Sequence, residues 1–326
     1  MKNSTTLAAR EICAANRIVL ACHINPDGDT LGCILALAHA FWELKKDVTL
    51  LSSDGVPEIY RWMPGANMVE TSTERRDFDL AIVCDAGALN RVGEKVLPAV
   101  TSAPKLINID HHISDGPFGD IQIVSPAASA TAELIWDLIK ELGVQVEREL
   151  ADRAIADCLM TGIITDTGSF RYLNVTPKTF RIAAELQELG ALPSPIYELV
   201  FENRSFQSQK LLGRALDSLQ LTSCGKIAWG HVRASDFEEF NADDVETEGI
   251  VNHIRAVQTA FIGILFREVP GKKVRISLRA RDGADVNKIA QVFGGGGHKL
   301  ASGCALEPPL DEVERRVVAE AVRQLG

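Results

Sequence analysis

The sequence predicts an α/β fold, in which a mostly parallel β-sheet flanked by helices is followed by a second, smaller α/β domain. Short apolar runs alternate with helix-like stretches through the first half of the chain. These runs lack the in–out alternation of a half-exposed strand, which indicates strands buried on both faces, as in parallel sheets. The stretch LGALPSPIYELVFENRSFQSQK then carries two prolines and loses this rhythm, which indicates a domain boundary.

Each expected element follows from its local pattern. In the first half, apolar runs predict strands over residues 18–22, 48–51, 80–84 and 106–109. Helix-like patterns there cover residues 30–44, 130–142, 150–163 and 177–189. Gly143 and Gly190 follow two of these helices and are typical helix stops. In the second half we expect helices over 208–219 and 285–293, and strands over 226–232, 259–266 and 273–278.

The chain of 326 residues is long enough for two domains, at roughly 100–200 residues each. We expect a metal-binding domain over 1–190, a linker over 191–210 and a substrate-binding domain over 211–326. Residues 251–300 carry nine Lys and Arg against three Asp and Glu, a charge of +6 that leaves −16 for the remainder. This asymmetry favours a metal-binding half and an anion-binding half.

Charge and cysteine usage limit the class of protein. A net charge of −10 argues against sequence-blind coating of DNA, which needs a basic face. The seven cysteines form no CxxC pair and predict reduced, mostly buried thiols in a cytoplasmic protein. We expect no membrane partner, because the N-terminus lacks an apolar signal region and no apolar run reaches the length of a span. Residues 235–249 hold seven acids and no Lys or Arg, which is typical of a solvent-exposed segment.

Acids and histidines gather in four separate motifs. Three motifs come at the ends of predicted strands: HINPDGD after the first, CDAG after the third and NIDHH after the fourth. The remaining motif, TDTGSF, follows a helix-like stretch. Because parallel strands end at one rim of a sheet, these side chains are expected to converge. They are His23, Asp27, Asp29, Asp85, Asp110, His111, His112 and Asp166.

Crowded carboxylates repel one another unless a positive charge lies among them. Imidazole and carboxylate ligands without a thiolate suit Mn²⁺ or a similar divalent ion, and their number is enough for two ions. Two ions ~3.5–4 Å apart need a bridging carboxylate, for which Asp85 is the candidate. Taken one at a time, the motifs also fit ordinary roles, such as a turn at residues 25–28 or a helix cap at Asp29. Without a metal site, all four motifs would have to serve such ordinary roles at the same time. Their joint occurrence therefore favours a metal site.

The second domain contains a glycine run, GGGGH, in a segment that also carries an arginine at the end of a predicted strand. Glycines allow the backbone to approach a ligand closely, and successive N–H groups can bind an anion. The arginine offers a two-pronged fork to a phosphate. A flexible loop with a solvent-facing arginine is the alternative. The expected anion-binding residues are Arg279, Gly294, Gly295, Gly296, Gly297 and His298.

Taken together, HINPDGDTLG, CDAG, NIDHH and TDTGSFRY resemble the four ordered motifs of the DHH phosphoesterases. GGGGH resembles the signature of the accompanying DHHA1 domain. The resemblance covers nearly the whole chain and implies a DHH catalytic domain followed by a DHHA1 domain that binds substrate. In size the chain resembles the stand-alone bacterial members that degrade oligoribonucleotides and dephosphorylate 3′-phosphoadenosine 5′-phosphate (pAp).

The resemblance also implies roles for the motif residues. The implied ligands of one Mn²⁺ are His23, Asp27 and Asp85. The implied ligands of the second Mn²⁺ are Asp29, Asp85, His111 and Asp166. His112 is implied to face the cleaved phosphate, and Asp110 to orient the histidine pair. The substrate's phosphates are implied to bind Arg279, the four glycines and His298.

The implied activity is the hydrolysis, by water that two metal ions activate, of short single-stranded RNA to nucleoside 5′-monophosphates and of pAp to AMP. Dinucleotides are further expected substrates. The alternatives are a phosphodiesterase for cyclic-di-AMP or its linear product pApA, and a family-II-type inorganic pyrophosphatase, which the glycine–histidine signature argues against. A non-catalytic nucleotide sensor is disfavoured because every motif position is filled. A homodimer is compatible with the sequence, which does not reveal the oligomeric state.

Overall fold

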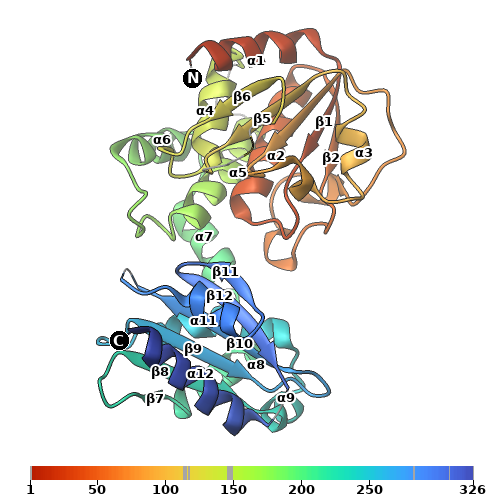
Figure 1. Ribbon diagram of the computed structural model, residues 1–326. Coiled ribbons are helices and arrows are strands. Elements are labelled where there is room, and N and C mark those ends of the chain that lie inside the picture. Colours follow the sequence, from red (N-terminus) through yellow and green to blue (C-terminus); the bar gives the residue numbers. More distant parts are fainter. Residues whose placement is uncertain are drawn as a thin grey trace. The chain divides into compact units, whose positions relative to one another are not determined.

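The computed structural model describes residues 2–112, 116, 118–144, 150–281, 283–307 and 309–325. It divides into two compact units, Met1–Asn203 and Arg204–Gly326. Each unit is built around one six-stranded sheet, and the elements are labelled in Figure 1. No helix in the described part of the chain is both long and apolar enough to cross a bilayer.

The first unit contains a parallel sheet with the strand order β3-β2-β1-β4-β5-β6. The strands are β1 (Arg17–Ala21), β2 (Asp47–Leu51), β3 (Val69–Glu70), β4 (Leu80–Cys84), β5 (Leu106–Asp110) and β6 (Ile121–Val124). The helices are α1 (Lys2–Ala14), α2 (Gly28–Glu43), α3 (Leu97–Val100), α4 (Thr131–Glu141), α5 (Leu150–Asp166), α6 (Pro177–Glu188) and α7 (Pro193–Tyr197). The fold class predicted from the sequence is confirmed, a mostly parallel sheet flanked by helices.

Both faces of this sheet are buried, which explains why its strands read as continuous apolar runs. Ile18 and Leu20 of β1 pack into the core that α2, α4 and α5 cover. Val19 and Ala21 of the same strand face the opposite core, which α3 covers. Each buried side chain of the size of leucine or isoleucine stabilises the fold by roughly 1.5–3 kcal/mol.

Glycines let α2 and α5 approach to backbone distance. A Cβ atom at Gly32 would lie 2.3 Å from the backbone oxygen of Cys158. A Cβ atom at Gly162 would lie 2.6 Å from Oδ1 of Asp29. The first turn of α2 therefore packs directly on the last turns of α5, which brings Asp29 near Asp166, the last residue of α5.

The second unit is built on a mixed sheet with the order β11-β12-β10-β9-β8-β7, in which only β8 and β9 are parallel among the described strands. The strands are β7 (Gln220–Leu221), β8 (Ile227–Val232), β9 (Ile262–Arg267), β10 (Val274–Ala280), β11 (Gly296–His298) and β12 (Ala301–Leu306). The helices are α8 (Phe206–Asp217), α9 (Ala234–Phe240), α10 (Ile250–Arg255), α11 (Val286–Val292) and α12 (Leu310–Leu325). Helices α11 and α12 cover one face, whereas α8, α9 and α10 cover part of the other.

Candidate active site

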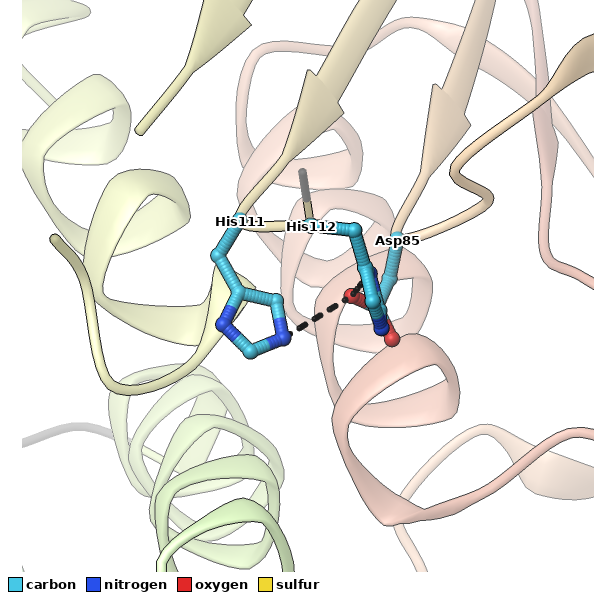
Figure 2. Close-up of side chains that lie close together, drawn as sticks. All are labelled: Asp85, His111 and His112. Carbon is cyan, nitrogen blue, oxygen red and sulfur yellow. Dashed lines mark ion pairs between the residues drawn. The ribbon is translucent and has the colours of Figure 1, made fainter. Parts of the chain in front are cut away.

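The acids and histidines of the first three motifs lie at one rim of the parallel sheet. Strands β1, β4 and β5 are neighbours, with Ala21 paired to Val83 and Cys84 paired to Ile109. His23 follows the end of β1, Asp85 follows β4 and His111 follows β5. In Figure 2 both rings of the His111–His112 pair lie beside Asp85. The expected convergence of these motifs therefore occurs within one unit of the protein.

His23, Asp27 and Asp85 form a first group in which one ligand atom from each lies within 4.8 Å of the others. Nε2 of His23 is 3.8 Å from Oδ2 of Asp27 and 3.6 Å from Oδ2 of Asp85. Nδ1 of His23 lies 2.8 Å from the backbone oxygen of Ile24, which fixes the ring. When Nδ1 donates to that oxygen, Nε2 carries the lone pair that a metal needs.

Asp27 also begins helix α2. Its Oδ1 accepts hydrogen bonds from the backbone N–H groups of Asp29 and Thr30, each at 3.1 Å. The ordinary role considered for Asp29, the helix cap, thus belongs to Asp27. Oδ1 serves as the cap, and Oδ2 lies on the side of His23. The same carboxylate therefore positions the helix and belongs to the first group.

Asp29, His111 and Asp166 form a second group within the same 4.8 Å limit. Nε2 of His111 lies 3.0 Å from Oδ2 of Asp166 and 3.6 Å from Oδ1 of Asp85. Asp29 comes from the first turn of α2 and Asp166 from the last residue of α5. The fourth motif was expected after a helix-like stretch, and the structure extends that helix to include its aspartate.

Asp85 lies between the two groups. Its Oδ2 is on the side of His23 and its Oδ1 on the side of His111. The residue is only 1% exposed, and its Oδ2 accepts no hydrogen bond. A buried carboxylate oxygen without a hydrogen-bond donor costs free energy unless a cation approaches it. This orphaned oxygen fits a metal ligand, and the two-sided position fits a bridge.

The protonation of the site has the pattern of a cation site. Burial and the charges of Asp85 and Asp166 raise the pKa of Asp29 well above its usual value. Burial opposes charging of His23, but the carboxylates of Asp27 and Asp85 outweigh it and raise the pKa of His23 to about 9. In the protein alone, protons therefore balance charges that divalent cations would balance instead. The oxygen and nitrogen donors of both groups support divalent metal binding.

His112 is the more exposed member of the histidine pair. Its backbone N–H donates to Oδ1 of Asp110 at 2.9 Å, and its Nδ1 lies 2.8 Å from the same oxygen. Oδ2 of Asp110 accepts from the backbone N–H of Gly87 at 2.7 Å. Hydrogen bonds to Asp110 and Asp85 raise the pKa of His112 to about 10. Asp110 therefore holds one side of the ring, and Nε2 is on the other side.

The predicted anion-binding residues lie in the second unit, where the register of the sheet brings two of them into one row. Ala301 of β12 is paired with Arg279 of β10 on one side and with His298 of β11 on the other. Residues directly opposite one another in a sheet point to the same face. Arg279 and His298 therefore share one face of the sheet. Nη1 of Arg279 donates to the backbone oxygen of Leu278 at 3.1 Å.

The glycine run makes a turn and enters a strand, so it is not the free loop that we considered as an alternative. Gly296 and Gly297 belong to β11 and pair with β12. A Cβ atom at Gly295 would lie 2.2 Å from the backbone oxygen of Gly303, and one at Gly297, where φ is +143°, would lie 2.6 Å from the backbone oxygen of Ala301. Close packing on β12 thus explains two of the four glycines, whereas a Cβ at Gly294 or Gly296 would meet no atom within 4 Å.

The comparison with known proteins agrees with this geometry. A model described as the N-terminal domain of the DHH family matches residues 17–163, and a DHHA1 domain model matches residues 229–325. The bifunctional oligoribonuclease and PAP phosphatase NrnA of Thermus thermophilus is 32% identical over 309 residues, 94% of this chain and 89% of that protein. The chain belongs to the DHH family.

Two further proteins are similar to this chain. The crystal structure of an exopolyphosphatase-related protein from Bacteroides fragilis has a TM-score of 0.88 and 26% identity, and the match covers 99% of this chain and 96% of that one. The cyclic-di-AMP phosphodiesterase PdeA of Listeria monocytogenes is 29% identical over 79% of this chain, but the match covers 36% of PdeA. The protein is a DHH phosphoesterase, a hydrolase that acts on phosphoester bonds.

Thr131 contributes to the DHH site, and sequence reasoning missed it. Its hydroxyl donates to Oδ1 of Asp85 at 2.8 Å, and its backbone N–H donates to Oδ2 of Asp29 at 2.6 Å. The N–H of Ala132 donates to the other oxygen of Asp29 at 3.0 Å. The first turn of α4 therefore holds two of the acids. In the sequence, Thr131 reads only as an ordinary residue at a helix start.

Proposed function

We propose that this protein hydrolyses short oligoribonucleotides to nucleoside 5′-monophosphates and dephosphorylates pAp to AMP, with two Mn²⁺ ions. The observation that carries the proposal is Asp85, a buried carboxylate placed between two ligand groups. Support for the substrates comes from the Thermus thermophilus relative, whose name gives both activities and which aligns over 94% of this chain.

Each group would hold one ion, with the ligands that the motifs imply. One ion would be held by His23, Asp27 and Asp85. The other would be held by Asp29, Asp85, His111 and Asp166. When bound, the ions supply an activated water at neutral pH and neutralise charge that develops on the phosphoryl oxygens. Mixed carboxylate and imidazole donors without a thiolate suit Mn²⁺.

The chain's own residues prepare the remaining groups. Asp110 and Asp85 hold Nδ1 of His112 at 2.8 Å and 3.3 Å, so Nε2 is the nitrogen left to meet a phosphoryl oxygen. In the metal-free protein, hydrogen bonds to Asp110 and Asp85 raise the pKa of His112 to about 10, which favours a protonated ring. A fixed imidazolium stabilises negative charge that develops on that oxygen, because it needs no rearrangement during the reaction. In the second unit, Arg279, His298 and the glycine run are proposed to bind the nucleotide's phosphates.

A second candidate function is the hydrolysis of cyclic-di-AMP or pApA. The observation that favours it is the alignment with the Listeria monocytogenes phosphodiesterase over 79% of this chain. Its support is narrower, because the match covers 36% of that protein. Both functions use the same ligand groups and differ in the substrate that fits.

A substrate panel with Mn²⁺ tests both functions. We expect pAp and short RNAs to release AMP or other 5′-monophosphates, and long RNA and pyrophosphate to react slowly. Faster turnover of cyclic-di-AMP than of any short RNA or pAp would favour the second candidate. Exclusive hydrolysis of pyrophosphate, or no product from any substrate, would overturn the proposal.

Replacing Thr131 by valine tests the positioning of Asp85. Valine keeps the shape and the backbone N–H to Asp29, but it removes the hydroxyl that donates to Asp85. We expect Mn²⁺ affinity and kcat each to fall by about 10–100-fold, the usual effect of removing a group that orients a metal ligand. Titration calorimetry and initial rates measure the two effects. Thr131→Ser keeps the hydroxyl and should keep most of the Mn²⁺ affinity and of kcat. Equal losses in the two variants would contradict the role of the hydroxyl in positioning Asp85.

Replacing Arg279 by alanine tests phosphate binding in the second unit. We expect KM for pAp to rise by about 10-fold or more, because a hydrogen bond to a charged group contributes roughly 1.5–3 kcal/mol. The value of kcat should change much less, because the ligand groups of the first unit are intact. Arg281→Ala is the control, since it removes the same charge from an arginine that binds the backbone oxygen of Gln258. An unchanged KM for Arg279→Ala would remove this residue from the substrate site.

A further inference from the structure

One short segment, residues 128–132, lies behind the second group of ligands. Its N–H groups donate to both carboxylate oxygens of Asp29. Its carbonyl oxygen at Ala128 lies 3.3 Å from Nδ1 of His111. When Nδ1 donates to that oxygen, the ring is fixed and Nε2 keeps the lone pair that a metal needs. The segment thus holds two of the three ligands directly, whereas the third, Asp166, belongs to the end of α5.

The side chain of Asn174 joins Asp166 to this segment. Its Nδ2 donates to the backbone oxygen of Ser129 at 2.9 Å and to the backbone oxygen of Asp166 at 3.2 Å. An asparagine amide carries two N–H donors on one nitrogen, so one side chain can meet both acceptors. Because both partners are carbonyl oxygens, the amide must present its nitrogen to them. The backbone of one ligand is therefore tied to the residue that follows the oxygen beside His111.

A left-handed turn brings Asn174 back to Asp166. The three consecutive residues 168–170 have φ of +54°, +59° and +62°, a region that a bulky residue such as Phe170 rarely enters. Thr167 closes the turn, because its hydroxyl accepts from the N–H of Phe170 at 2.9 Å and its backbone oxygen accepts from the next two N–H groups. Such strained backbone persists where its surroundings hold it, often at functional sites. Here the turn returns the chain to the carbonyl group of a ligand eight residues earlier.

The start of helix α6 fixes the far end of this turn. The hydroxyl of Thr176 caps the helix by accepting from the N–H of Thr179 at 3.3 Å. The hydroxyl of Thr179 donates to Oε1 of Glu133 at 2.7 Å, and the hydroxyl of Ser129 donates to the same oxygen at 2.6 Å. Both Ser129 and Glu133 are fully buried. One buried carboxylate therefore anchors the segment behind the ligands and the end of the turn, and Asn174 lies between these two fixed points.

We propose that Asn174 is a positioning residue for the second metal ion. It holds Asp166 against the segment that orients Asp29 and His111, so the three ligands share one geometry before an ion binds. Ligands that are already in place bind more tightly, because less ordering remains to be done when the ion arrives. The first group is held by other contacts, from the backbone of Ile24 and the start of α2. The inference rests on the proposed function in that it takes two metal ions at this site.

Calorimetric titration of the metal-free full chain with Mn²⁺ tests this role, because it compares two ions within one protein. In Asn174→Ala we expect the affinity for one ion to fall by about 10–100-fold, the usual effect of losing a group that supports a metal ligand. The affinity for the other ion should stay at the wild-type value, whereas a general loosening of the first unit would weaken both. Asp166→Asn identifies the affected step, since it should remove the same ion that Asn174→Ala weakens.

Leu173→Ala is the matched control. It shortens the neighbouring side chain of the same turn, which is 94% exposed and has no polar atom, so both ions should bind as in the wild type. Equal weakening of both ions in Asn174→Ala, no weakening there, or the same loss in Leu173→Ala would overturn the proposal. The expected pattern in a protein that hydrolyses neither RNA nor pAp would overturn the proposed function alone. Binding of a single ion by the wild type would overturn both.

Discussion

Replacing Asp85 by asparagine is expected to abolish turnover of every substrate while the fold persists. Removing one preorganised electrostatic group typically costs about 10²–10³ in kcat. Asp85 belongs to the first ligand group and lies 3.6 Å from His111 of the second, so we expect a loss beyond this range. Asparagine retains the size of the side chain and a carbonyl oxygen that accepts from Thr131. Steady-state rates with pAp and Mn²⁺, together with a thermal melt, measure both effects.

Asparagine is a better replacement than alanine for a backbone reason. Asp85 has φ +60°, a left-handed conformation that asparagine and aspartate adopt more readily than other residues with a side chain. Asp85→Ala should therefore lose activity equally and also lose some stability. A melting temperature that falls for Asp85→Ala but not for Asp85→Asn would separate the effect of backbone strain from the effect of losing the carboxylate.

The control for Asp85 lies at the opposite end of the same strand. Asp79 precedes β4 and pairs with Arg17. Asp79→Asn therefore removes an equal charge at the opposite edge of the sheet, away from both ligand groups. We expect its kcat to match that of the wild type. If Asp85→Asn kept more than about a tenth of the wild-type rate, the bridging role would have to be abandoned.

The sequence was sufficient to predict the rim of the first sheet because a general rule of topology determines it. Four apolar runs predicted four strands, and parallel strands must end together. His23, Asp85 and His111 are therefore close because of the strand order β1-β4-β5. Asp166 lies outside this rule, because it comes from the end of α5, and only the contact between α2 and α5 brings it near Asp29.

The features that the sequence did not predict depend on contacts between distant segments. The hydroxyl of Thr131 reaches Asp85 across 46 positions of the chain, and no local pattern distinguishes it from a helix-start threonine. Strand β11 consists of two glycines and a histidine, which have no strand propensity of their own, so its pairing with β12 decides its structure. Asp244 reads as one acid among seven and is buried only because Arg267 of β9 meets it.

Metal removal is expected to abolish turnover and to lower the melting temperature of the first unit. A ligand at 100 times its Kd stabilises the folded state by about 2.7 kcal/mol per site, which corresponds to roughly 5–10 °C for a domain of this size. The physical reason is the crowding of buried acids, since burial and neighbouring charges raise the pKa values of both Asp29 and Asp166. Melts and rates in EDTA, and after Mn²⁺ is restored, measure both effects.

The two units provide an internal control for this experiment. Within the described residues, each group able to hold a metal lies in the first unit, so Mn²⁺ should raise the unfolding transition of that unit and leave that of the second unchanged. Asp85→Asn should lose most of the Mn²⁺-dependent shift, because the first group loses a carboxylate and the second loses the neighbouring carboxylate 3.6 Å from His111. An equal shift in the wild type and in Asp85→Asn would show that Mn²⁺ stabilises the protein elsewhere. Full activity in EDTA would exclude a metal from the reaction and leave the crowded carboxylates to be balanced by protons on His23, His111 and His112.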